Sequence, residues 1–402
     1  MAVTATRAAP TGRLSSPVAS YYLLATSTVL LVIVGLAVVL SSSSIDSIKA
    51  DGDPYALFKA QVIYLAVGVG LCVIVSRAST AFFKAVGPWL LFASVGALVL
   101  VALSPWGRST GGNKNWLDFG NFSAQPSELA KLALALYLGI SLSNIRHRMT
   151  NFRGAFVPAG VVAVLVVALV LAGRDIGTAL VMIILVFAAY WTAGLPMRFL
   201  AGGLFSTGFV LWLLVSVRPK LLERVAAWWS PSCDTQNQCW QVTHGTWALA
   251  SGGVWGLGPG LSREKWSYLP KASNDFIYAI LGEEFGLVGT VFVLVALAMI
   301  VIAVNRIVQR NRDPFVQITA AAIGAWIVGQ ACLNIAVVVG LAPVTGVPLP
   351  LVSSGGSSLV TSLVGIGVLL AFARGEPGAR EALVARRHRR AGRSAPAEVA
   401  DG

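Results

Sequence analysis

Ten long runs of apolar residues, separated by short polar segments, dominate the sequence. A helix that crosses the hydrocarbon core of a bilayer needs about 20 apolar residues. Only 12% of the 402 residues are charged, whereas soluble domains carry about 25%. We therefore predict an all-α polytopic membrane protein with about ten transmembrane helices. The predicted spans are 19–40, 60–75, 88–103, 127–142, 155–172, 177–193, 199–217, 285–304, 315–340 and 358–373.

The charge pattern indicates how these spans are oriented. Basic residues concentrate in the loops after even-numbered spans and in the C-terminal tail, whereas most acidic residues lie in the opposite loops. Loops rich in lysine and arginine stay in the cytoplasm, so both termini are expected there. Residues 1–17 and 375–402 are predicted to be disordered cytoplasmic tails, the second strongly basic. The net charge of +13 thus fits attraction to anionic membrane lipids rather than to nucleic acid.

A long extracytoplasmic loop, about residues 218–284, is predicted between spans seven and eight. Loops of this length are commonly functional. Its tryptophans suit the headgroup interface, with a platform for a sugar as the alternative. Cys233 and Cys239 both lie in this loop. A local disulfide between them is expected in an oxidising exterior, and two free thiols are the alternative.

Two charged motifs lie at the ends of predicted spans. In the motif QPSELAK, Glu128 falls in the first helical turn and Lys131 lies one turn deeper on the same face. A lysine within an apolar span faces the bundle interior or a cavity, so Lys131 either pairs with Glu128 or binds an anionic substrate. Between spans five and six, Arg174 and Asp175 favour an ion pair that organises the turn, and substrate binding by Asp175 is the alternative.

Two stretches near the long loop's end carry candidate site residues. A glycine-rich run, 251–260, predicts tight turns at the membrane surface. Arg263 and Lys265, just after it, are candidate ligands for pyrophosphate or lipid headgroups. Asp275 lies at the outer end of a predicted helix that Ser273 or Asn274 would cap. An ionised carboxylate there accepts a proton or binds a cation, with simple capping as the alternative.

The run 341–358 is apolar but rich in proline and glycine, which predicts non-helical backbone. At membrane depth such backbone is tolerated only inside protein or along a cavity. We therefore expect this run to line a cavity, with Ser357 as a candidate substrate-binding residue. The sequence contains no metal-ligand spacing and no catalytic serine–histidine–aspartate pattern, although a carboxylate can hold Mg²⁺ together with substrate phosphates.

Three segments together resemble a known family. QPSELAK, LPKASNDFIYAILGEE and PVTGVPLPLVSSGGSS, in this order and spacing, resemble the SEDS family of FtsW, RodA and SpoVE, and most closely the FtsW proteins of actinobacteria. The family's essential aspartate falls on Asp275, the lysine and acid of its QPSELAK motif on Lys131 and Glu128, and its turn aspartate on Asp175. Departures at Arg174, Lys271 and Ser354, and a displaced Lys114, concern local loops rather than Asp275.

The resemblance implies a peptidoglycan glycosyltransferase that polymerises lipid II outside the bacterial cytoplasmic membrane, at the division septum. It also implies a class B penicillin-binding transpeptidase and other division proteins as partners. The chemistry needs a base for the attacking hydroxyl and cations for the departing pyrophosphate. Asp275 suits the first role, and Lys131, Arg263 or a divalent cation such as Mg²⁺ or Mn²⁺ suits the second, with no tightly bound cofactor expected. The alternatives are a lipid II flippase, a non-catalytic scaffold and a RodA-type polymerase for elongation.

Overall fold

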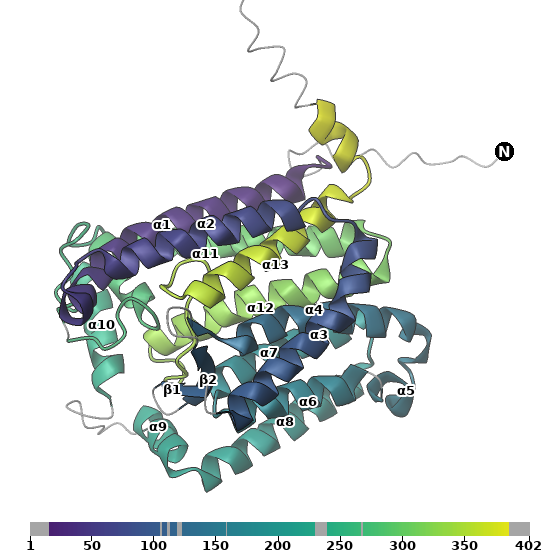
Figure 1. Cartoon of the computed structure of the whole chain (residues 1–402), viewed down its shortest axis with the longest axis horizontal. Helices are drawn as coiled ribbons and strands as arrows, with labels where there is room; N and C mark the ends of the chain where they lie inside the picture. Colours follow the sequence, from purple (N-terminus) through teal and green to yellow (C-terminus); the bar gives the residue numbers. More distant parts are fainter. Residues whose placement is uncertain are drawn as a thin grey trace, which may run out of the picture.

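The computed structural model describes residues 16–104, 107–110, 113–118, 123–157, 159–229, 239–266 and 268–385. Its elements form a bundle of long helices with a small sheet at one end (Figure 1). In chain order the helices and strands are α1 (Ala19–Asp51), α2 (Ala56–Val75), α3 (Thr80–Leu103), β1 (Gly107–Thr110), β2 (Asn113–Asp118), β3 (Ser123–Ala124), α4 (Pro126–Asn144), the 3₁₀ helix η2 (Arg146–Arg148), α5 (Phe152–Phe156), α6 (Ala159–Ala172), α7 (Ile176–Ala193), α8 (Met197–Val217), α9 (Pro219–Trp229), α10 (Trp240–Gly252), α11 (Ile277–Arg310), α12 (Pro314–Val338) and α13 (Gly356–Arg374).

The predicted membrane fold is confirmed, because eight helices of the described chain are long and apolar enough to cross a bilayer. They are α1, α2, α3, α7, α8, α11, α12 and α13. The other two predicted spans coincide with α4, which carries Glu128 and Lys131, and with α6, an apolar helix of 14 residues. The count of ten spans stays a prediction, and the chain is a multi-pass membrane protein.

The centre of the bundle is formed by α4, α7 and α12, which pack against one another. Around them α1 packs on α11, α2 on α13, and α3 on α4. By contrast, α8 buries only Leu200 among its described side chains and lies along the lower edge of the view in Figure 1. Apolar side chains that face lipid need no protein cover, so the exposed surface of α8 is consistent with a helix at the bundle periphery.

Helix α11 breaks at Gly286, whose backbone has a φ of 64° that favours glycine. The glycine-rich run packs directly on this break. Leu257 N–H donates to the Glu283 carbonyl at 2.9 Å, and Leu287 N–H donates to the Gly253 carbonyl at 2.9 Å. A Cβ at Gly256 would lie 2.2 Å from the Glu284 carbonyl oxygen, so glycine is needed for this close approach as well as for the turns predicted from the sequence.

The structure adds detail to the predicted fold. A three-stranded antiparallel sheet, β1-β2-β3, adds to a fold predicted to be all helical. The long loop contains two helices, α9 and α10. The predicted C-terminal tail is ordered and partly helical as far as residue 385, because Glu376 is buried and pairs with Arg310 at 3.1 Å. The Pro17 side chain lies 3.7 Å from the position that a Cβ on Gly378 would occupy. The start of α1 therefore lies beside the segment that follows α13.

Candidate functional site

Asp275 lies in the short connection that leads into α11, and its carboxylate is almost buried, with the residue 5% exposed. The Lys271 ammonium lies 3.2 Å from Oδ2, and the Lys271 side chain is half-exposed. Oδ1 has no hydrogen-bond partner within the described part of the chain. The predicted capping is wrong, because α11 begins only at Ile277, with Phe276 as the N-cap residue. Asp275 Oδ1 is thus a buried acceptor that no donor of the described chain uses.

The proline- and glycine-rich run packs against the Asp275 segment. Ser353 Oγ donates to the Asn274 carbonyl at 2.7 Å, and Ser354 Oγ donates to the Ser273 carbonyl at 2.7 Å. A Cβ at Gly346 would lie 3.7 Å from Asp275 Oδ2. The run is non-helical between α12 and α13, as predicted, and the loop of residues 343–354 lies beside the carboxylate.

Two side-chain amides of α12 hold this loop. Gln330 Nε2 donates to the Pro348 carbonyl at 2.9 Å. Asn334 Nδ2 donates to both the Val347 and the Asp275 carbonyls at 2.7 Å. Gln330 was missed from the sequence, although a polar amide inside an apolar span is itself a signal of interior function.

Lys131 and Glu128 form a buried ion pair, as one of the two predicted alternatives requires. The Lys131 ammonium lies 2.9 Å from Glu128 Oε1 and 2.7 Å from Gln330 Oε1, and it also lies 5.0 Å from the Trp326 ring centroid. An ammonium has only three N–H donors, and Lys131 is 1% exposed. In this arrangement Lys131 supports Gln330 from within the bundle, and direct substrate binding by Lys131 or Glu128 stays a prediction.

Asp175 caps the N-terminus of α7. Its carboxylate accepts from the Thr178 N–H at 3.0 Å and hydroxyl at 2.9 Å. It also accepts from Asn115 Nδ2 at 2.8 Å and Gln125 Nε2 at 3.0 Å. Asp175 therefore caps α7 with Oδ1 and ties it to β2 and to the start of α4 through Oδ2, and the expected partner Arg174 is not among these contacts. Its role in substrate binding is untested.

The two basic residues after the glycine-rich run have different surroundings. Lys265 is buried, and its ammonium donates to Ser41 Oγ at 2.8 Å and to the Gly260 carbonyl at 2.6 Å. Glu284 Oε1 lies 3.5 Å from the same ammonium and also accepts from the Ser41 hydroxyl. These contacts join the loop to α1 and α11. Arg263 is exposed, so it is the more accessible cation of the pair.

The remaining predicted residues are less defined by their contacts. Ser357 is half-buried in the first turn of α13, and its carbonyl accepts from Thr361 Oγ1 at 2.8 Å. Cys239 is disulfide-bonded. Cys233 lies outside the described residues, so the predicted pairing of these two cysteines stays a prediction.

The electrostatic surroundings of Asp275 act in opposite directions. Burial raises the pKa of the Asp275 carboxyl above its ordinary value. The Lys271 ammonium lowers this pKa, and the negative charge of Asp175 raises it further. Since burial is the largest effect, Asp275 binds a proton more readily than an exposed aspartate does.

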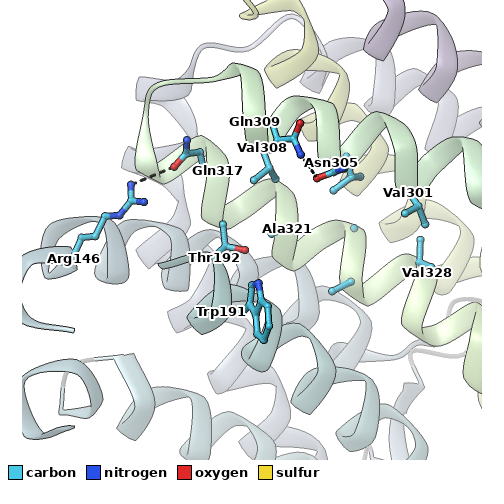
Figure 2. A pocket seen from close by; sticks show the side chains of 13 residues that line it. Arg146, Trp191, Thr192, Val301, Asn305, Val308, Gln309, Gln317, Ala321 and Val328 are labelled. Atoms are coloured by element: carbon cyan, nitrogen blue, oxygen red, sulfur yellow. Dashed lines mark hydrogen bonds between the residues drawn. The ribbon is translucent and has the colours of Figure 1, made fainter. Parts of the chain in front are cut away.

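A cavity of about 740 Å³ lies beside the C-terminal half of α11 (Figure 2), whereas Asp275 precedes the N-terminus of that helix. Valine side chains of α11 and α12 line one part of it, and Arg146, Gln317, Gln309 and Asn305 supply polar groups. Arg146 Nη1 donates to Gln317 Oε1 at 3.3 Å. This cavity lies at the end of the bundle where basic loops are found, so it does not belong to the site around Asp275.

Comparisons with known proteins agree on one family. Residues 21–376 match the profile of the FtsW, RodA and SpoVE cell cycle proteins. The chain is 36% identical over 374 residues to a probable peptidoglycan glycosyltransferase FtsW of Mycobacterium tuberculosis, covering 93% of this chain and 71% of that protein. It is 32% identical to the stage V sporulation protein E of Bacillus subtilis, covering 88% and 96% of the two chains.

Two solved structures have a similar fold. A chain from a peptidoglycan synthase complex, in a study of coordinated polymerisation and crosslinking, superposes with a TM-score of 0.71 at 26% identity, covering 88% of this chain and 97% of that one. The rod shape determining protein RodA of Thermus thermophilus superposes with a TM-score of 0.65 at 25% identity, with the same coverage.

Proposed function

Because the chain belongs to the FtsW, RodA and SpoVE family, we propose that it is a peptidoglycan glycosyltransferase that polymerises lipid II. The names of its relatives support the activity. One observation in the structure carries the assignment of the site: Asp275 is a buried carboxylate with one oxygen beside Lys271 and the other unpartnered within the described chain. That geometry suits a base that receives a proton from a substrate hydroxyl.

In the proposed reaction, the acceptor sugar hydroxyl attacks the anomeric carbon of the donor. The new glycosidic bond forms as the bond to the lipid pyrophosphate breaks, and the pyrophosphate departs with that electron pair. Asp275 takes the hydroxyl proton. Lys271 and Arg263 are both exposed, and their positive charges stabilise the departing pyrophosphate. Lys131 acts indirectly, through its contacts inside the bundle.

A divalent cation is a further component of this proposal. Three oxygens on neighbouring segments are buried and unpartnered in the described chain: Asp275 Oδ1, Asn274 Oδ1 and Thr345 Oγ1. Oxygen ligands of this kind suit Mg²⁺ or Mn²⁺, which commonly completes its coordination with water and substrate phosphates. Such an ion would neutralise charge on the pyrophosphate.

We also propose that both termini are cytoplasmic and that Asp275 faces the exterior of the bacterial cytoplasmic membrane. The basic loops support this orientation. The similarity to FtsW of Mycobacterium tuberculosis supports work at the division septum. A solved relative belongs to a complex that couples polymerisation to crosslinking, which supports a class B penicillin-binding transpeptidase as partner.

The test is polymerisation of lipid II by the purified protein together with its transpeptidase partner. Asp275→Asn removes the base while keeping the shape of the side chain, and general-base catalysis is worth about 10²- to 10⁴-fold in rate. We expect glycan chains to fall by that factor. Asp53→Asn is a matched control, because Asp53 pairs with the exposed Lys59. Undiminished chain formation by Asp275→Asn refutes the assignment, and transport of lipid II without chain formation by the unaltered protein supports a flippase instead.

A further inference from the structure

We propose that Asn334 is a positioning residue for Asp275 and that Gln330, four residues earlier on α12, contributes to the same positioning. The inference rests on the proposed function, because it concerns how the catalytic base is held. Neither residue belongs to the motifs QPSELAK, NDF or GGSS.

The Asn334 amide joins two segments that are distant in sequence. A side-chain amide has two N–H donors, and Asn334 places one on the Asp275 carbonyl and one on the Val347 carbonyl, both at 2.7 Å. Asn334 is 2% exposed, so water does not replace these contacts. The single side chain therefore sets the distance between the backbone of the base and the loop of residues 343–354.

The loop in turn lies beside the reacting carboxylate. Gly346, adjacent to Val347, is the residue whose Cβ would lie 3.7 Å from Asp275 Oδ2. The serines at the other end of the loop bind the carbonyls of the two residues before Asp275. Movement of Val347 would therefore change the space on one side of the carboxylate.

Gln330 holds the next carbonyl of the loop from one helical turn away. Residues four apart share a helix face, and Gln330 donates to Pro348 at 2.9 Å while accepting from Lys131 at 2.7 Å and from Trp326 Nε1 at 3.0 Å. The buried Lys131–Glu128 pair thereby holds the amide of Gln330 in one orientation. Consecutive carbonyls, Val347 and Pro348, are thus fixed by two amides on a single rigid helix.

This arrangement predicts a kinetic effect that packing alone does not. A misplacement of about 1 Å at a reacting group costs about 10²-fold in rate. Asn334→Leu keeps the branched shape of the side chain and removes both donors. We expect kcat for polymerisation to fall about 10- to 100-fold with KM for lipid II changed less than about threefold. We also expect amide hydrogen exchange within residues 343–354 to become faster.

The matched control is Asn305→Leu on α11. Asn305 lines the distant cavity and accepts from Gln309 Nε2 at 3.1 Å (Figure 2), so kcat and exchange in the loop should be unchanged. If Asn334→Leu does not yield folded protein, Asn334→Ser, which keeps one donor, is measured in its place. Unchanged kcat and unchanged loop exchange overturn the proposal. An active Asp275→Asn protein in the same series would instead remove the proposed base, whatever Asn334 does.

Discussion

Replacing Lys131 by methionine separates its two predicted roles, and the structure sets the size of the effect. Without the ammonium, the buried Glu128 carboxylate keeps only the Thr361 hydroxyl, at 3.2 Å, as a described side-chain donor. Breaking a buried ion pair costs about 3–5 kcal/mol, and loss of the contact with the Trp326 ring adds about 1 kcal/mol. We therefore expect Lys131→Met to lower the free energy of unfolding by about 5 kcal/mol.

The double variant Glu128→Gln/Lys131→Met removes both charges. Replacing a buried pair by neutral groups of similar size is commonly close to neutral, so most of the lost stability should return. Unfolding by SDS in mixed micelles, followed by tryptophan fluorescence, measures both differences. A double variant as unstable as Lys131→Met would refute the assignment of this cost to an uncompensated charge.

Polymerisation by the same proteins then tests the role of Lys131 in the reaction. If Lys131 acts only through Gln330, the double variant should retain activity within about tenfold of the unaltered protein, since Gln330 Nε2 still reaches the Pro348 carbonyl. A double variant that is stable and yet forms no glycan would show that the ammonium itself contacts the substrate. That result would refute the positioning role inferred from the burial of Lys131.

Two further predictions concern the surroundings of Asp275. The pKa of Asp275 is raised by burial and lowered by Lys271, so the polymerisation rate should decline as pH falls through a midpoint above that of an ordinary aspartate. Lys271→Ala should move this midpoint higher. The rate measured against pH tests both, and an unchanged midpoint in Lys271→Ala would contradict the reasoning. Gly177→Ala should lower the polymerisation rate at least tenfold, because the new Cβ would lie 2.6 Å from the Thr345 carbonyl oxygen and would displace the loop. Gly202→Ala is the control, because open space surrounds that position. Equal rates in the two variants would show that displacement of the loop does not affect the reaction.

The sequence alone was sufficient for the membrane fold. Long apolar runs specify spans because a bilayer offers no hydrogen-bond partners to unfolded backbone. The ion pair between Lys131 and Glu128 followed from residue types and spacing as one of two alternatives, since both residues lie on one helix face. The short sheet was missed because its strands contain only four, six and two residues, too few to show a clear alternation.

The tertiary structure decided which charges remain available. Lys265 and Arg263 are near neighbours in sequence and chemically alike, yet Glu284 and Ser41 enclose Lys265 while Arg263 is exposed. Gln330 and Asn334 resemble any polar residues of an apolar helix until Lys131, Asp275 and the loop carbonyls are placed beside them. Local sequence cannot predict such partners, because they come from segments far apart in the chain that meet only when the helices pack. Burying a charge or an amide without a partner costs free energy, so the helices pack stably only where these partners come together.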